Sequence, residues 1–367
     1  MIERIYANNF RCFENFTLDL TDLPSALIVG GNGSGKSTLR HVLRVLQSLA
    51  RGASRIRHVV EKSDFTRGRT DIPLRLEVDL QIEGRKITYA LALEFPEHFR
   101  EARVQEELLE VDGIRVFSRS LGEISFAHGA ASLLDWHLAA LPIVSVRDRD
   151  LERVRRQLQI FLGSMVLISP TPTAMVGYAE DESTELEADA SNLAAWLMSL
   201  LSRRPAAYND ILTYLRSAIP DFDSFGYIPR GERGKQLTVT FRSPENAASL
   251  PLEFRQLSDG EKCLLLSAVV IASNADQPVF CFWDEPDNHL SLSEVGHFIT
   301  ALRKMIHRNG QFIATSHHPE TIRRFSSDST IVFSRKSHLE PTSVQLLSEK
   351  SVSGDLIHAL LRDEVLG

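Results

Sequence analysis

The chain has 367 residues, of which 43% are hydrophobic and 24% charged, and its formal net charge at pH 7 is −7. This length predicts two or three lobes, and no apolar run approaches the roughly 20 residues of a membrane span, so we expect a soluble, cytoplasmic protein. The negative charge argues against a protein coated with basic surface, and the absence of a C-x-x-C pair argues against a zinc site or disulfide framework. We expect buried thiols at Cys12, Cys263 and Cys281.

Residues 1–48 predict a strand, a hairpin, a second strand and a helix, with a glycine-rich loop before the helix. The loop fits the pattern G-x-x-x-x-G-K-[ST] and reads Gly30-Gly31-Asn32-Gly33-Ser34-Gly35-Lys36-Ser37. The apolar run 27–29 and the helical run 38–46 supply the strand and helix that this phosphate-binding motif needs. Glycines let the backbone approach a phosphate, which then faces N–H groups and the helix N-terminus. We expect Lys36 to reach the β- and γ-phosphates and Ser37 to bind Mg²⁺.

Residues 40–69 carry a local excess of positive charge, contributed by Arg40, Arg44, Arg51, Arg55, Arg57, Lys62, Arg67 and Arg69. One interpretation is a surface that contacts the phosphate backbone of DNA or RNA, without reading base sequence. The other is an ordinary helix-and-loop surface that pairs with the acidic segment 180–189.

Residues 72–95 carry the clearest period-2 pattern in the chain. Apolar residues at even positions from 74 to 82 alternate with charged or polar ones, and a second alternating run follows a turn at Glu83-Gly84. This pattern predicts an antiparallel hairpin with one buried face. A second hairpin is expected around Asp112-Gly113, a dipeptide typical of tight turns.

Two helical regions are predicted in the middle of the chain, at residues 151–162 and 192–218. Asp148 and Asp150 place favourable charge at the start of the first region. Asn192 is the expected N-terminal cap of the second. The acidic segment 180–189 between them has the composition of a solvated, mobile loop.

From about residue 237 the pattern alternates strand, helix, strand, helix and strand, which predicts a parallel sheet. Ser258 and Glu261 form a capping-box pattern before the helical run 263–273. Gly260 between them would let an anion approach this helix end closely.

Two short polar motifs follow apolar strands in this region. Asp284 and Glu285 follow the run 278–283, and a carboxylate at such a strand end can position Mg²⁺ beside a phosphate loop, while its neighbour polarises the attacking water. His317 and His318 end the apolar run that begins at Ile313, and a histidine there is a candidate contact for a γ-phosphate.

The order of these motifs resembles that of ABC-type ATPase heads: the phosphate loop, then L-S-x-G-E at 257–261, D-E-P at 284–286 and T-S-H-x-P at 315–319. The residues of these motifs and of segment 5–13 are similar to those of the SMC/RecF/OLD branch rather than to those of transporters. The resemblance covers residues 1–48 and 237–335. The resemblance implies an α/β ABC-ATPase head, with a P-loop parallel sheet and an antiparallel β-subdomain, interrupted by an inserted helical lobe. The implied divisions are 1–125 for the N-terminal half of the head, 126–236 for the mainly helical lobe and 237–367 for the C-terminal half.

The resemblance also implies the roles of the site residues, with ATP and Mg²⁺ as ligands. Asp284 is the Walker B acid and a metal ligand together with Ser37, Glu285 is the catalytic carboxylate, and His317 is the switch histidine. Phosphate contacts are implied for Gly30, Asn32, Gly33, Ser34, Gly35, Lys36, Ser37 and Thr38. Ser258 and Gly260 would contact the γ-phosphate held by the opposite subunit, so that two ATPs join a head-to-tail homodimer. Residues 287–290 fall where the dimer-contacting D-loop lies.

Two features depart from the family pattern. No glutamine stands near residues 165–172, where a Q-loop glutamine is expected. The usual acid or histidine-proline after the Walker B loop is replaced by Ser291-Leu292-Ser293. The position of the Q-loop therefore stays open.

The leading hypothesis is an ATP-hydrolysing switch whose ATP-bound dimer grips DNA or RNA, or controls a separate nuclease or toxin effector, as in compact relatives from anti-phage defence. Higher oligomers are compatible with it. Two alternatives stay open: a RecF-like ATPase of DNA repair or recombination, and a scaffold that turns ATP over slowly. A subunit of a membrane transporter is disfavoured by the wording of the signature motif.

Overall fold

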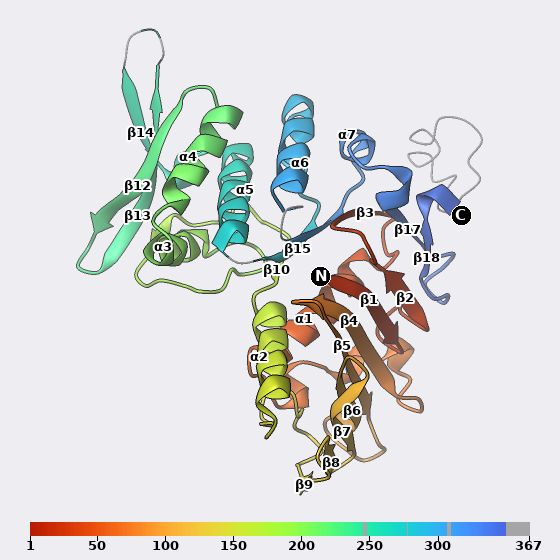
Figure 1. Cartoon of the computed structure of the whole chain (residues 1–367). Helices are drawn as coiled ribbons and strands as arrows, with labels where there is room; N and C mark the ends of the chain where they lie inside the picture. Colours follow the sequence, from red (N-terminus) through yellow and green to blue (C-terminus); the bar gives the residue numbers. More distant parts are fainter. Residues whose placement is uncertain (244, 246–247, 277, 307–309, 350–367) are drawn as a thin grey trace. The chain divides into compact units, whose positions relative to one another are not determined.

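The structure is a computed structural model that describes residues 1–243, 245, 248–276, 278–306 and 310–349. The chain forms two compact units (Figure 1). Unit 1 comprises Met1–Met165 and the described residues from Ser327 onward, and unit 2 comprises Val166–Ser326.

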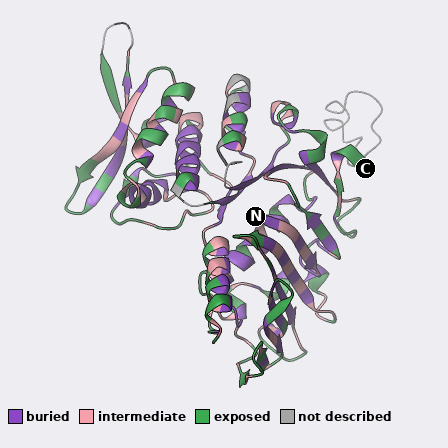
Figure 2. Cartoon of the chain, viewed as in Figure 1, coloured by how far each residue is buried: buried purple, intermediate pink, exposed green. Residues whose placement is uncertain are grey.

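The large sheet of unit 1 is antiparallel throughout, in the order β2-β1-β4-β5-β6-β7-β8-β9. Its strands are β1 (Ile2–Asn8), β2 (Phe16–Asp19), β4 (Leu74–Ile82), β5 (Arg85–Glu94), β6 (Arg103–Val111), β7 (Ile114–Ser120), β8 (Glu123–Phe126) and β9 (Ala131–Leu133). Both predicted hairpins are confirmed, as β4-β5 and β6-β7, and their turns place Glu83-Gly84 and Asp112-Gly113 at positive φ. The alternation along β4 appears as alternating burial, which Figure 2 shows as stripes.

Two amphipathic helices pack together in unit 1, α1 (Lys36–Ala50) and α2 (Arg149–Gly163). Each buries residues at helical spacing: Leu39, Val42, Leu43 and Leu46 on α1, and Leu151, Val154, Leu158 and Leu162 on α2. Asp148 caps α2, because its side chain accepts hydrogen bonds from the N–H groups of Asp150 and Leu151. The 3₁₀ turns η1 (Ile56–His58), η2 (Lys62–Asp64) and η3 (Thr66–Gly68) follow α1.

A second group of strands in unit 1 carries the phosphate loop. β3 (Ser25–Val29) is buried along its whole length and pairs in parallel with β17 (Thr330–Ser334), which pairs antiparallel with β18 (Ser343–Leu346). The 3₁₀ turns η5 (Ser327–Ser329) and η6 (Leu347–Glu349) flank these last two strands. The apolar run before the phosphate loop is thus a buried strand, as predicted.

The alternating pattern expected after residue 237 is confirmed for its later strands, which are parallel, but its first strand, β13 (Gly234–Arg242), belongs to an antiparallel sheet. β15 (Phe280–Asp284) pairs in parallel with both β10 (Val166–Ile168) and β16 (Gln311–Thr315). The accompanying helices are α5 (Asp259–Asp276), α6 (Leu292–Ile306) and α7 (Pro319–Arg323). The carboxyl ends of β15 and β16 lie side by side, because Asp284 and Thr315 are register partners.

An antiparallel sheet and two helices complete unit 2. The sheet has the order β11-β13-β12, with β14 also paired to β13, and comprises β11 (Tyr178–Ala179), β12 (Phe222–Arg230), β13 (Gly234–Arg242) and β14 (Ser249–Glu253), after which η4 (Phe254–Gln256) follows. The predicted helical stretch 192–218 is two helices, α3 (Leu193–Arg203) and α4 (Ala207–Ala218), because Pro205 lies between them.

Asn192 does not cap α3 with its side chain, which corrects the prediction. It occupies the N-cap position, but its Oδ1 accepts from the N–H of Glu187, and its Nδ2 donates to the carbonyl oxygen of Glu185, 2.9 Å away in each case. Its side chain therefore stabilises the preceding acidic segment, because these local backbone groups compete with the helix for it.

All three cysteines are buried and free, as predicted. Among the described residues no helix combines the length and apolar character needed to cross a membrane. The α/β class, the parallel strand pairs and the antiparallel subdomain agree with the expected fold.

Candidate functional site

The phosphate loop of unit 1 connects β3 to α1 and needs glycine where its backbone is crowded. Gly35 has φ 108°, and a Cβ there would lie 2.7 Å from the ring of Phe13 and 2.9 Å from the hydroxyl of Thr342. A Cβ on Gly30 would lie 2.3 Å from the carbonyl oxygen of Phe333. Both positions therefore exclude any larger residue, as the motif predicts.

The polar groups of the loop fit a phosphate. Lys36 is buried, and its Nζ donates to the carbonyl oxygens of Gly30, at 2.6 Å, and Gly31, at 3.1 Å. The buried Ser34 hydroxyl has no hydrogen-bond partner within the described residues, which calls for one from a bound group. Gly35, the N-cap of α1, offers no side chain to the N–H groups of the first turn, and Ser37 is exposed beside them.

Two segments that are distant from the motif in the sequence hold the phosphate loop in place through hydrogen bonds. The Thr342 hydroxyl donates to the carbonyl oxygen of Ser34 at 2.8 Å, and the Thr342 N–H donates to the carbonyl oxygen of Cys12 at 3.1 Å. The Cys12 thiol in turn lies 3.3 Å from the hydroxyl of Thr38, at the start of α1. Sequence reasoning predicted Cys12 as a buried thiol but not its contact with this loop, and it missed Thr342, which belongs to no motif.

The start of α5 in unit 2 carries the predicted capping box. Ser258 N–H and Oγ donate to Glu261 Oε2 at 2.7 and 2.8 Å, and the N–H of Glu261 donates back to Ser258 Oγ at 3.2 Å. A Cβ on Gly260 would lie 3.0 Å from the carbonyl oxygen of His289, so the L-S-x-G-E segment at 257–261 packs closely against residues 287–290. Ser258 itself is exposed.

Asp284, Glu285 and His317 lie together at the adjacent ends of β15 and β16. The Thr315 hydroxyl donates to Asp284 Oδ1 at 2.5 Å and accepts from the N–H of Glu285 at 3.0 Å. His317 Nε2 lies 3.9 Å from Glu285 Oε1, with both side chains exposed. Glu285 Oε2 also accepts from Asn288 at 2.6 Å. Thr315 and Asn288 lie within the motifs quoted from the sequence, but the sequence reasoning did not predict their hydrogen bonds to Asp284 and Glu285.

The basic segment after the phosphate loop is partly neutralised within unit 1. Glu101 pairs with Arg55 at 2.5 Å and lies 3.9 Å from Arg57. Glu14 pairs with Arg67 and with Arg69. The acids beside these four arginines therefore differ from the acidic segment 180–189 suggested by the sequence.

The pKa of His41 on α1 depends on the charged residues around it. Burial, followed by the positive charges of Arg11 and Arg40, lowers the pKa of His41 to about 4. The nearby Arg44 adds to this effect and is exposed. Asp64 opposes these charges, and three arginines against this one carboxylate leave this part of unit 1 electropositive, which would favour an anion.

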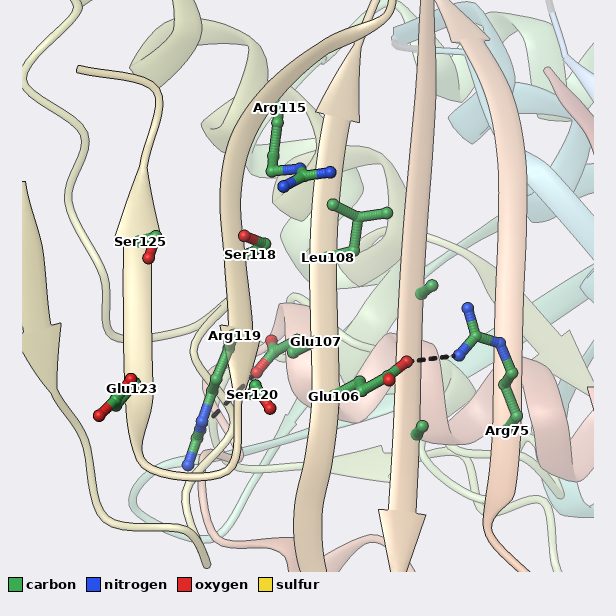
Figure 3. Close-up of a pocket in the computed structure, with 12 residues that line it drawn as sticks. Arg75, Glu106, Glu107, Leu108, Arg115, Ser118, Arg119, Ser120, Glu123 and Ser125 are labelled. Carbon is green, nitrogen blue, oxygen red and sulfur yellow. Dashed lines mark hydrogen bonds and ion pairs between the residues drawn. The ribbon is translucent and has the colours of Figure 1, made fainter. Parts of the chain in front are cut away.

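A cavity of about 300 Å³ lies on the antiparallel sheet of unit 1, and none of the residues that line it is a predicted site residue (Figure 3). Beside it Arg119 lies 3.9 Å from Glu107, and both side chains are fully buried. Glu107 accepts hydrogen bonds from the N–H groups of Ala140 and Leu141, while burial raises its pKa above the usual range. This network joins β6 to the segment at 140–141 and has a structural role.

Comparisons with known proteins agree with this architecture. The family profile described as "AAA domain, putative AbiEii toxin, Type IV TA system" matches residues 25–323, and one described as "AAA domain" matches residues 4–45. No curated protein matches the sequence.

Two solved structures share the fold. The SmcHead bound to the C-winged helix domain of ScpA is 16% identical, with a TM-score of 0.58, over 95% of this chain and 98% of that one. The Smc head domain with an extended coiled coil bound to the C-terminal domain of ScpA, from Pyrococcus furiosus, is 16% identical, with a TM-score of 0.52, over 95% and 97%.

Proposed function

Because this chain belongs to the AAA-domain family matched over residues 25–323 and has the fold of an SMC-type ATPase head, we propose that it is an ATP-hydrolysing switch. The observation that carries this proposal is the phosphate loop, where glycines enclose the buried Lys36 and a Ser34 hydroxyl without a partner among the described residues. A nucleoside triphosphate would supply an acceptor for the Ser34 hydroxyl and negative charge beside the Lys36 ammonium group.

We assign ATP binding to the predicted phosphate contacts. Lys36 neutralises the β- and γ-phosphates, and the N–H groups at the start of α1 donate to them. Gly30, Asn32, Gly33, Ser34, Gly35, Ser37 and Thr38 complete this half of the site. Mg²⁺, for which the sequence predicts Ser37 and Asp284 as ligands, would supply positive charge that offsets the negative charge developing on the phosphates.

Hydrolysis is assigned to Glu285 and His317. Glu285 takes a proton from the attacking water, and His317, whose Nε2 lies 3.9 Å from the Glu285 carboxylate, contacts the γ-phosphate. The mutual proximity of these two side chains supports the assignment, since each is positioned by the end of a different strand.

We further propose that two copies close head-to-tail around two ATPs. The exposed Ser258 at the N-terminus of α5, with Gly260, would then contact the γ-phosphate bound by the partner subunit. ATP binding would favour the closed dimer and hydrolysis would favour opening.

The output of the switch is DNA or RNA binding, or control of a separate effector. The electropositive surroundings of His41 support contact with a phosphate backbone. The description of the matched family names a putative toxin of a Type IV TA system, which agrees with an effector of the toxin class, and anti-phage defence is the setting that we propose for it. A RecF-like repair ATPase is the alternative, and a neighbourhood of replication genes would favour it.

Two variants test the proposal. Lys36→Ala should lose ATP binding, whereas Glu285→Gln should bind ATP, hydrolyse it slowly and accumulate as a dimer measured by light scattering. Lys86→Ala and Glu232→Gln, which change exposed residues, are the matched controls. Parental hydrolysis in both test variants would overturn the assignment. Tight ATP-dependent dimerisation with negligible turnover in the parent protein would favour the scaffold instead.

A further inference from the structure

A buried carboxylate lies two residues after Glu285 and has no role in the site described above. Asp287 is 4% exposed, and its Oδ2 accepts hydrogen bonds from the hydroxyls of Ser316 and Thr321, both of which are fully buried. Burial of a carboxylate is costly unless donors replace its water. The two hydroxyls meet that requirement, so they specify where Asp287 can lie.

These hydrogen bonds fix the backbone on both sides of His317. Ser316 directly precedes His317, and its hydroxyl accepts from the N–H of His318 at 2.8 Å. His318 in turn caps α7, since its Nδ1 accepts from the N–H of Glu320 at 3.2 Å. Thr321 lies within α7. Asp287 therefore contacts the segment before the switch histidine and the helix after it.

The same carboxylate belongs to a turn that holds Glu285 in a strained conformation. Glu285 has φ 53°, in the left-handed region that a residue with a Cβ rarely adopts. The turn after it closes through hydrogen bonds from the N–H of Asn288 to the carbonyl oxygen of Glu285 and from the N–H of Leu290 to that of Asp287, each 3.3 Å long. A strained residue persists only where its surroundings hold it, and Asp287 anchors this turn.

We propose that Asp287 is a positioning residue that, through Ser316 and Thr321, holds the Glu285 carboxylate and the His317 imidazole at their working separation. This inference rests on the proposed ATPase function and deepens it. It also revises the expectation for residues 287–290: the Asp287 carboxylate acts inside its own subunit, while the exposed Asn288 and His289 are the side chains available to a partner subunit.

A pair of substitutions at Thr321 tests the inference with little change in packing. Thr321→Val removes the hydroxyl and keeps the shape, whereas Thr321→Ser keeps the hydroxyl. We expect Thr321→Val to lower kcat roughly 10- to 100-fold, because small misplacements of catalytic groups are costly, with the Kd for a fluorescent ATP analogue unchanged. Thr321→Ser should retain a kcat close to that of the parent. Ser316→Ala removes the other donor and should reproduce the loss of kcat, so the test does not depend on one variant folding.

Ser273→Ala is the matched control, because within the described part of unit 2 its buried hydroxyl bonds only to the carbonyl oxygen of Val270 on the same helix. It should change the melting temperature and leave kcat at the parental value. If Thr321→Val and Ser316→Ala keep the parental kcat while Glu285→Gln loses it, the positioning role is wrong and the ATPase function stands. If Glu285→Gln also hydrolyses ATP like the parent, the proposed function itself fails.

Discussion

The Thr342 hydroxyl donates a 2.8 Å hydrogen bond to the carbonyl oxygen of Ser34, which joins the phosphate loop to a residue 308 positions later in the chain. Thr342 is 5% exposed and lies just before β18. Thr342 also lies close to Gly35, because a Cβ on Gly35 would lie 2.9 Å from the Thr342 hydroxyl. The shape of the loop therefore depends on the C-terminal strands of unit 1.

Thr342→Val should weaken nucleotide binding while leaving kcat at saturating ATP close to the parental value. The substitution leaves the Ser34 carbonyl without this donor, which costs about 1–3 kcal/mol where the group stays buried. Titration with a fluorescent ATP analogue and thermal unfolding measure the two effects. Thr342→Ser, which retains the hydroxyl, is the control, and equal affinities for the two variants would contradict the prediction.

Gly35→Ala should abolish ATP binding and destabilise the protein. The left-handed conformation costs an alanine about 1–2 kcal/mol, and the contact with Phe13 adds to this cost. Gly84→Ala separates the two effects, because Gly84 has φ 79° with no atom within 4 Å of its missing Cβ. It should cost stability alone. The prediction fails if both variants bind ATP with the same affinity, measured by calorimetry.

Glu152 should make the stability of unit 1 depend on pH in the acid range. The hydrogen bonds of Arg155, and then those of Arg156 and the N–H of Val146, lower the pKa of Glu152 from 4.5 to about 2. Because its pKa is lower in the folded state, the carboxylate stabilises the fold above pH 4.5, and this stabilisation is lost as the pH falls from 4.5 towards 2. The full shift corresponds to about 3 kcal/mol, and solvent screening of the exposed Arg156 reduces that contribution.

Glu152→Gln should therefore lower the free energy of unfolding at pH 7 and flatten its dependence on pH below 4.5. Urea unfolding at several pH values measures both. Glu232→Gln, at an exposed turn, should leave the curve unchanged. A Glu152→Gln curve parallel to that of the parent down to pH 2 would show that the carboxylate titrates normally.

His41 offers a direct probe of nucleic-acid binding. A bound phosphate backbone would offset the charges of Arg11 and Arg40 and raise the pKa of His41 from about 4, which NMR titration of its ring protons can follow. Arg44→Gln should weaken binding to DNA and make the slope of log K against log salt concentration shallower by about 0.9 for each phosphate that is no longer neutralised.

Arg153→Gln is the matched control for that experiment, because Arg153 is exposed on α2 and paired with Glu83. It should bind DNA like the parent. An unchanged pKa of His41 in the presence of saturating DNA would contradict the prediction that nucleic acid binds beside this residue.

The elements that the sequence predicted correctly are those that depend on near neighbours. The β4-β5 hairpin follows from alternation and its Glu83-Gly84 turn, and the capping box follows from Ser258 and Glu261 three positions apart. Asn192 was misassigned because its side chain had a choice of partners. It bonds the backbone of Glu185 and Glu187, and a local pattern does not reveal which partner it takes.

The sequence by itself determined the motifs that mark this chain as an ATPase head, because a phosphate loop or a capped helix start is specified by residues within a few positions of one another. Only the tertiary structure decided which distant residues hold those motifs in place. Thr342 reaches Ser34, and Asp287 reaches Ser316 and Thr321, because strand pairing brings together ends that are far apart in the chain. Buried polar groups then form hydrogen bonds with the side chains that strand pairing brings close to them.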